Sequence, residues 1–240
     1  MVDISIVIAC YNEEPLLEES VNKIMAVMDA TRWKYELIFV DDRSHDNTRQ
    51  IIERIIAENP RYILKKIFHE RNTGRGKAVK DGMLVAEGTY VGYLDIDLEV
   101  GAHYIPLMVI TLQQGADIAT AFRVYKETFN LLFRTVLSIG YRFLMHMMLK
   151  IPVKDTETGY KFFNRERILS VLKETKDPGW FWDTEIMALS YHANLKIVEL
   201  PCLFIRRYDK KSSVNIFRDS FEYFTKLVKF SRELKTIRNK

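Results

Sequence analysis

Short apolar runs alternate with segments of helical periodicity over about the first 120 residues, and this alternation restricts the fold more than any other feature. The predicted strands cover residues 4–10, 35–40, 63–68, 89–94 and 117–121. The predicted helices between them cover residues 16–30, 51–56, 74–86 and 107–113. Such an alternation predicts an α/β fold with a doubly wound, Rossmann-like and mostly parallel central sheet flanked by helices.

The pattern changes after about residue 122. We expect a long amphipathic helix over residues 125–150, then a mixed segment, a strand over residues 197–205 and a last helix over residues 217–235. A chain of 240 residues fits one large domain with an appended tail. We therefore predict one domain over residues 1–215, with halves 1–122 and 123–215, and a C-terminal amphipathic basic helix over residues 216–240.

Charge and cysteine content narrow the class of protein. The net charge of +4 is too mild to indicate nucleic-acid binding, and no nucleic-acid recognition motif occurs. Cys10 and Cys202 lie in apolar runs, which favours buried free thiols, and so low a count suits a reducing cytoplasm. The sequence predicts neither a signal peptide nor a membrane-spanning helix, because no apolar run is long enough.

Polar clusters follow three of the predicted strands. In a parallel α/β sheet, ligands bind at the carboxyl ends of the strands, so these clusters are the first functional signal. They are Tyr11-Asn12-Glu13, Asp41-Asp42 and Asp95-Ile96-Asp97.

Asp95, Asp97 and Glu99 alternate, so they point to one side if the chain stays extended beyond the strand. Three carboxylates on one side repel one another unless a cation joins them, and oxygen ligands select Mg²⁺ or Mn²⁺. The alternative is a solvated acidic loop. The position after a buried strand favours the metal site.

Two further segments suggest contacts with a nucleotide. One of Asp41 and Asp42 is expected to cap a turn, and the other could accept hydrogen bonds from a nucleobase or a ribose. Residues 72–77 open a helix with two glycines, Arg75 and Lys77, so a cationic loop beside a phosphate is one interpretation. Their spacing matches neither a Walker P-loop nor a dinucleotide-binding fingerprint.

Together these residues resemble family 2 glycosyltransferases with the GT-A fold, through residues 6–13, 40–48, 72–78 and 95–99. The later segment DTETGYKFF, residues 155–163, resembles a block of polyprenyl-phosphate glycosyltransferases such as the dolichyl-phosphate mannose and glucose synthases. Residues 181–185 and the basic segment after Glu199 also resemble that branch. The resemblance covers nearly the whole chain.

The resemblance implies inverting transfer of a sugar from a UDP- or GDP-linked donor to a polyprenyl or dolichyl phosphate. It implies that Asp95 lies near the ribose and the metal and that Asp97 binds the metal. Glu99 stands where this branch often has Gln, and it can still act as a ligand. The expected donor-binding residues are Tyr11, Asn12, Glu13, Asp41, Asp42, Lys77 and Asp95. Residues 1–122 would then bind the donor, and residues 123–215 the acceptor.

The acceptor decides whether a base is needed. A lipid phosphate is already an anion, so it needs cations to hold it, whereas a sugar hydroxyl needs a base. Asp155 and Asp183 are the candidate bases, with a structural ion pair or cap as the alternative. The expected catalytic residues are Asp95, Asp97, Asp155 and Asp183. The expected acceptor-binding residues are Arg123, Lys161, Arg207, Lys210, Lys211 and Ser213.

Two predicted helices suggest a membrane. The helix over residues 125–150 has a wide apolar face, which either packs on the sheet or lies in a membrane interface. The last helix carries Phe217, Phe221, Phe224 and Val228 on one face and several basic residues beyond them. These suit anionic lipid headgroups, or the dipole at a helix end. We expect peripheral attachment at the cytoplasmic face of a membrane, with a membrane-protein partner or a homo-oligomer as possibilities.

Two other functions fit parts of this pattern. One is a soluble family 2 glycosyltransferase that acts on a sugar hydroxyl in glycan or polysaccharide synthesis, which would require a base at Asp155 or Asp183. The other is a nucleotide-binding regulatory module that has lost transfer. The presence of Asp95 and Asp97 argues against that module.

Overall fold

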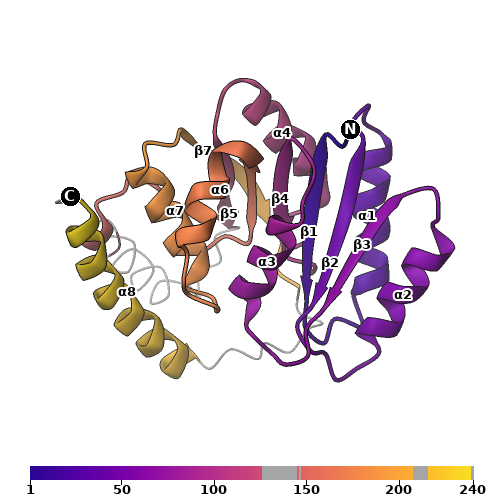
Figure 1. Cartoon of the computed structure of the whole chain (residues 1–240), viewed down its shortest axis with the longest axis horizontal. Coiled ribbons are helices and arrows are strands. Elements are labelled where there is room, and N and C mark those ends of the chain that lie inside the picture. Colours follow the sequence, from indigo (N-terminus) through magenta and orange to yellow (C-terminus); the bar gives the residue numbers. More distant parts are fainter. Residues whose placement is uncertain (126–144, 146, 208–215, 239–240) are drawn as a thin grey trace.

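A computed structural model describes residues 1–125, 145, 147–207 and 216–238. Helices flank a seven-stranded sheet with the order β3-β2-β1-β4-β6-β5-β7 (Figure 1). The strands are β1 (Ile4–Cys10), β2 (Tyr35–Asp41), β3 (Ile63–Phe68), β4 (Tyr90–Leu94), β5 (Ile118–Tyr125), β6 (Tyr160–Asn164) and β7 (Ile197–Phe204). The helices are α1 (Leu17–Asp29), α2 (Thr48–Glu58), α3 (Arg75–Leu84), η1 (Ala102–Tyr104), α4 (Ile105–Gln113), α6 (Arg165–Glu174), α7 (Trp182–His192) and α8 (Ile216–Arg238).

The sheet is apolar on both faces because helices cover both. Along β1, Val7 joins a core with α3, α6 and α7, whereas Ile6 and Ile8 join a core with α1, α2 and α4. This two-sided burial explains why β1 is an uninterrupted apolar run. The predicted α/β class and the mostly parallel sheet are confirmed, and the strands predicted up to residue 121 all form.

Strand β6 is antiparallel to its neighbours β4 and β5, whereas the other pairings are parallel. The start of β6 therefore lies at the edge where the other strands end, with Tyr160 paired to Leu94. This arrangement places residues 158 and 159 beside the segment that follows β4. The sequence predicted only a mixed segment there, and it missed β6, α6 and α7.

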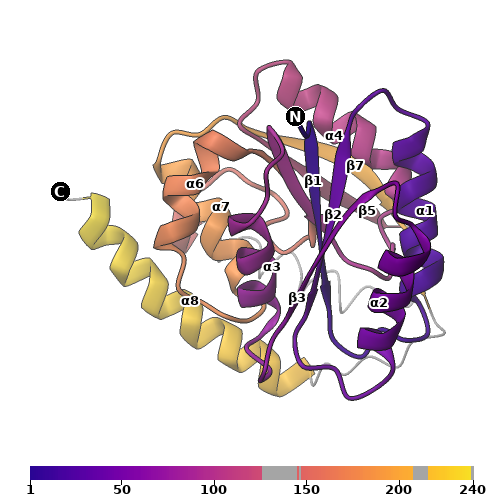
Figure 2. The same ribbon diagram turned by 45° about the vertical axis from the view of Figure 1, so that its right-hand side comes forward.

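Helix α8 runs along the outer side of α7 (Figure 2), and in Figure 1 it lies at the opposite end of the molecule from α2. Among its described side chains, Leu227, Phe230 and Leu234 are the buried apolar ones, and Phe230 packs edge-on against Phe181. Phe224 is 43% exposed. Of the predicted apolar face, Phe224 is thus exposed and Val228 is half-buried, whereas the side chains of Phe217 and Phe221 lie outside the described residues. The core selects a neighbouring face of the helix, at positions 227, 230 and 234.

Cys10 and Cys202 are buried free thiols, as predicted, and burial raises the pKa of Cys202 to about 12. Most of the helix expected over residues 125–150 lies outside the described residues. Among the described residues, no helix combines the length and the apolar character that crossing a membrane requires.

Candidate functional site

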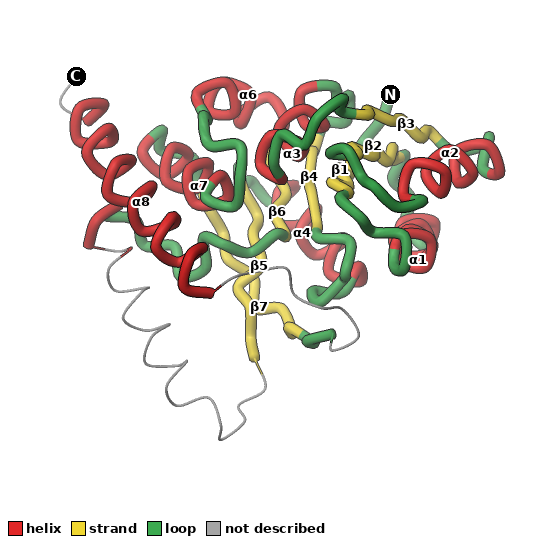
Figure 3. The backbone as a smooth tube through the Cα atoms, turned by 90° about the horizontal axis from the view of Figure 1, so that it is seen from below, coloured by secondary structure: helices red, strands yellow, loops and turns green. Residues whose placement is uncertain are grey.

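A pocket of about 70 Å³ lies at the carboxyl edge of the sheet. Figure 3 looks toward this edge from below. The end of β4, the start of β6 and the ends of β5 and β7 all contribute to the pocket. Its lining residues are Asp95, Asp97, Glu99, Val100, Arg123, Thr158, Gly159, Tyr160 and Phe204.

The three carboxylates reach this pocket by a route that the sequence did not predict. The chain does not stay extended after β4, because it turns at Asp95, where the Leu98 amide donates to the Asp95 carbonyl. Leu98 adopts a positive φ of 52° in this turn. Val100 then forms a bridge with Phe204, and the Ile205 amide donates to the Glu99 carbonyl at 2.8 Å. The end of β7 therefore holds Glu99 beside the pocket.

Each of these carboxylates already has a protein partner. Asp95 accepts from the Arg75 guanidinium, Asp97 Oδ1 accepts from the Glu99 amide at 3.2 Å, and Glu99 Oε1 accepts from the Arg207 amide at 3.0 Å. Within the described ranges, no three acidic, histidine or cysteine side chains gather closely enough to form a ready set of metal ligands. Three carboxylates on one pocket nevertheless have the donor chemistry that Mg²⁺ and Mn²⁺ prefer.

Arg123 brings a positive charge to the same pocket. Its Nε and Nη2 atoms donate to the two oxygens of Asp155 at 2.7 and 2.8 Å. Burial alone would raise the pKa of Asp155, but Arg123 outweighs this effect, so the pKa lies below its ordinary value. Glu199 accepts from the amide of Asp155 and so holds its backbone. Arg207 contributes its backbone amide to Glu99, and its guanidinium lies 4.0 Å from Glu19.

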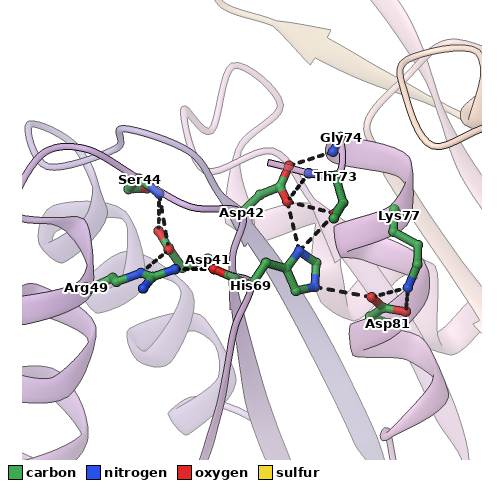
Figure 4. A network of polar contacts seen from close by, with 9 residues as sticks. All are labelled: Asp41, Asp42, Ser44, Arg49, His69, Thr73, Gly74, Lys77 and Asp81. Atoms are coloured by element: carbon green, nitrogen blue, oxygen red, sulfur yellow. Dashed lines mark hydrogen bonds and ion pairs between the residues drawn. The ribbon is translucent and has the colours of Figure 1, made fainter. Parts of the chain in front are cut away.

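Asp42 is 3% exposed, and its two oxygens contact His69, Thr73 and Gly74 (Figure 4). The Thr73 and Gly74 amides donate to it at 2.8 and 2.7 Å. Burial by itself would raise the pKa of Asp42, but the hydrogen bonds from His69, Thr73 and Gly74 keep it below the ordinary value. In this structure Asp42 therefore holds the loop before α3 against the end of β2.

Asp41 has a different set of partners. It accepts from the Ser44 amide and pairs with Arg49 at 2.5 Å (Figure 4). Asp41 therefore stabilises the turn after β2, as the sequence predicted for one residue of this pair.

The start of α3 packs against protein. The Lys77 amide donates to the Pro178 carbonyl at 3.0 Å, and the Lys77 ammonium pairs with Asp81. A Cβ atom added at Gly74 would lie 2.4 Å from the Pro178 oxygen, and one at Gly76 would lie 2.4 Å from Trp182 Cβ. The glycines of the segment 72–77 thus permit close approach of the segment 178–182 in this structure.

In the segment after β1, Asn12 is held by hydrogen bonds to the protein, whereas the side chain of Tyr11 is exposed. Asn12 has a positive φ of 57°, and it exchanges hydrogen bonds with Ser44 and His45. The Glu13 amide donates to Thr48 Oγ1 at 2.9 Å. The Tyr11 side chain is 43% exposed and lies edge-on to His45. Of this predicted cluster, Tyr11 is the side chain most available to a ligand.

Asp183 and Lys161 lie together in a buried cluster with Arg75 and Tyr93. Lys161 is wholly buried, and its ammonium group donates to Asp183 Oδ1 at 2.9 Å and to the Thr158 carbonyl. In this structure the Lys161 ammonium group therefore contacts protein partners inside the core. Burial lowers the pKa of Lys161, although Asp183 opposes the shift.

The sequence did not reveal this cluster. Its signal was one charged residue inside each of two apolar segments, YKFF and FWD. A buried charge in such a segment needs a partner of opposite sign. Here Lys161 in one segment and Asp183 in the other are partners.

The predicted acceptor-binding residues Lys210, Lys211 and Ser213 lie outside the described residues.

Comparison with known sequences gives one family and several relatives. Residues 5–170 match the model of the family described as Glycosyl transferase family 2. The glycosyltransferase AglD of Haloferax volcanii is 27% identical over 223 residues, which are 91% of this chain and 35% of that protein. A dolichyl-phosphate beta-glucosyltransferase of Saccharomyces cerevisiae is 26% identical over 218 residues, 82% of this chain and 65% of that protein. The chain thus spans less than two thirds of these relatives.

Comparison of structures gives the same kind of fold. Glucosyl-3-phosphoglycerate synthase from Mycobacterium tuberculosis, in a complex with Mn²⁺, UDP-glucose and phosphoglyceric acid, superposes with a TM-score of 0.70. The match covers 96% of this chain and 80% of that one, at 19% sequence identity. At this identity the likeness shows a shared fold.

Proposed function

The chain belongs to glycosyl transferase family 2 and has the GT-A fold, and from this premise we propose that it transfers a sugar from a nucleotide-diphosphate donor to a polyprenyl or dolichyl phosphate. The names of the relatives support this acceptor, because dolichyl-phosphate beta-glucosyltransferases match over 82% of the chain. Glucose is accordingly the first sugar to test.

One observation carries the proposal: acidic and basic side chains line a single pocket. Asp95, Asp97 and Glu99 meet Arg123 there. A sugar transfer from a nucleotide to a phosphate brings two anions together, a diphosphate and an acceptor phosphate. Carboxylates suit a metal-bound diphosphate, and a guanidinium suits a phosphate. The pocket has both.

Asp97, with Asp95 and Glu99, would hold a Mg²⁺ or Mn²⁺ ion. Such an ion would supply Lewis-acid stabilisation of the charge on the departing diphosphate. The proposal includes the metal because the donor chemistry of these residues fits it, and because a protein of the same fold has been crystallised with Mn²⁺.

The remaining chemistry needs little proton transfer. An oxygen of the acceptor phosphate bonds to the anomeric carbon while the bond to the diphosphate breaks, with inversion at that carbon. The acceptor is already an anion at pH 7, so Arg123 has to hold and orient it rather than activate it. Asp155 has a lowered pKa and both oxygens on Arg123, which suits an orienting role.

We place the reaction at the surface of a membrane, on its cytoplasmic side. The acceptor lipid resides in a membrane, and α8 carries exposed Lys229, Arg232 and Phe224. Basic and aromatic side chains together favour contact with anionic headgroups. A membrane-protein partner or a homo-oligomer is compatible with this placement.

The test is transfer of radiolabelled sugar from UDP-glucose, GDP-mannose and UDP-N-acetylglucosamine to a polyprenyl phosphate, with Mn²⁺ or with EDTA. We expect metal-dependent label in the organic phase with one of these donors. The label should disappear in Asp97→Asn and persist in Asp117→Asn, because Asp117 lies at the amino end of β5, away from the pocket. Label that stays in water-soluble glycan would exclude the lipid acceptor. Absence of turnover with every donor would contradict the transferase proposal.

A further inference from the structure

Arg75 is a largely buried cation that joins two carboxylates from distant parts of the chain. It is the first residue of α3, and its side chain is 13% exposed. Its Nε and Nη2 atoms donate to Asp95 Oδ1 at 3.0 and 2.6 Å. Its Nη1 atom donates to Asp183 Oδ2 at 2.5 Å. One guanidinium therefore links the segment after β4 to the first turn of α7.

Two aromatic rings lie against this guanidinium. The Arg75 Cζ atom lies 5.6 Å from the ring centre of Tyr93 and 5.0 Å from that of Trp180. A flat guanidinium gains from such stacking and presents several donors in a rigid fork, whereas a lysine ammonium does neither. The site is thus shaped for arginine rather than for positive charge alone.

The second oxygen of Asp95 remains available to the pocket. Among the described residues, no hydrogen bond uses Asp95 Oδ2. This oxygen lies over Gly159, where an added Cβ atom would approach it to 1.9 Å. Asp95 and Gly159 both line the pocket. Arg75 therefore occupies one oxygen of Asp95 and leaves the other beside the pocket.

In Asp183, in contrast, both carboxylate oxygens accept hydrogen bonds from protein side chains. It is 1% exposed, and its Oδ1 atom accepts from the Tyr93 hydroxyl and from Lys161. Its Oδ2 atom accepts from Arg75. Such a carboxylate anchors its partners and does not abstract a proton from a bound substrate.

We propose that Arg75 is a positioning residue that holds Asp95 in place for the metal-bound donor, and that Asp183 is the anchor that holds Arg75. The inference rests on the proposed function, because it assigns Asp95 to the donor and its cation. It also gives Asp183 a role other than that of the general base. Groups that orient a metal ligand typically change metal affinity or activity by about 10- to 100-fold when they are lost.

The decisive variant is Arg75→Lys, which keeps the positive charge and removes the rigid fork. We would titrate Mn²⁺ into the protein with UDP or GDP present, by isothermal calorimetry, and record thermal melting of the same samples. We expect about a tenfold or greater loss of Mn²⁺ affinity in Arg75→Lys, with the protein still folded. The matched control is Arg167→Lys, because Arg167 pairs with Asp117 at 3.1 Å at the other end of the sheet. Its Mn²⁺ affinity should equal that of the wild type.

A second variant tests the anchor. Asp183→Asn should also weaken Mn²⁺ binding, and the double variant with Arg75→Lys should be no weaker than Asp183→Asn alone, since both act through one contact. A general base would instead lower kcat and leave Mn²⁺ affinity unchanged. If Asp183→Asn does not fold, the Arg75→Lys titration decides alone.

The outcomes separate this inference from the proposed function. Equal Mn²⁺ affinity in wild type and Arg75→Lys would overturn the positioning role while the donor site stands. Additive losses in the double variant would overturn the link through Asp183. A wild-type protein that binds neither nucleotide, with or without Mn²⁺, would overturn the proposed donor and the inference together. Failure of the lipid acceptor in the transfer assay would leave the inference untouched.

Discussion

The guanidinium of Arg123 forms a two-point contact with the carboxylate of Asp155, with N–O distances of 2.7 and 2.8 Å. Arg123 also lines the carboxylate pocket. This contact fixes the direction of the cation at the place where the proposed acceptor phosphate would lie. The pair therefore provides two predictions, one about catalysis and one about stability.

Arg123→Lys should raise the KM for polyprenyl phosphate by about tenfold, because lysine keeps the charge but loses the two-point geometry that orients a phosphate. The KM for the donor should change little. Steady-state kinetics with each substrate varied in turn would measure both. Arg54→Lys is the control, since Arg54 is an exposed residue that pairs with Glu18. An equal rise in both KM values would contradict a specific role toward the acceptor.

Asp155 should make the free energy of unfolding depend on pH in the acid range. Its pKa in the folded protein lies below the ordinary Asp value of about 3.9, so its stabilising effect is complete above that value. The effect is lost as the pH falls through the lower pKa of the folded state. Urea unfolding between pH 6 and pH 2 should therefore show a shallower acid decline in Asp155→Asn than in the wild type. Parallel curves would show that the ion pair contributes nothing to this decline.

Gly159→Ala should damage the site, because the new methyl group would lie 1.9 Å from Asp95 Oδ2 and 2.4 Å from Arg75 Nη2. We expect at least a tenfold loss of kcat and a decrease of about 1–3 kcal/mol in the free energy of unfolding. Gly179→Ala is the control, since its Cβ atom would meet Asp177 Oδ1 at an ordinary 3.4 Å. Transfer assays and urea unfolding of both variants would test the prediction, and an active Gly159→Ala protein would refute it.

Leu227→Ala should detach α8 partly from the core. Leu227 is fully buried, and removing such a side chain typically costs about 2–5 kcal/mol of unfolding free energy. Phe224→Ala, one turn earlier and 43% exposed, should change stability by less than about 1 kcal/mol. Thermal and urea unfolding would compare them. Equal losses would mean that the helix packs through a different face in solution.

Reversing the charges of Lys229 and Arg232 should weaken binding to anionic vesicles. Both residues are exposed on α8, and a basic residue near such a surface contributes about 1 kcal/mol. The double Glu variant should therefore bind phosphatidylserine vesicles at least about 30-fold more weakly. Cosedimentation with vesicles would measure this, with pure phosphatidylcholine vesicles as the control. Unchanged binding would place the membrane contact, if any, on another surface.

Local patterns in the sequence determined the strands up to β5 and the residues at their ends. Buried parallel strands are short apolar runs, and the rule that their carboxyl ends converge made Asp95, Asp97 and Glu99 candidates for one site. The structure places all three on one pocket. The sequence predicted that Glu99 would join them because the chain stays extended after the strand, and this reason was wrong. A turn at Asp95 and a bridge between Val100 and Phe204 of β7 bring Glu99 to the pocket. The bridge depends on a contact far along the chain.

Tertiary structure alone decided the buried cluster and the packing of α8. Nine consecutive residues of α7 are buried, polar ones among them, so this stretch has no exposed side and gives no periodic signal. Arg75 and Asp183 are 108 positions apart, so no local pattern pairs them. The face of α8 that packs depends on the shape of the surface around Phe181 that receives it. Periodicity identifies elements that are buried on one side, whereas elements buried on every side, and the partners of buried charges, follow only from the packed fold.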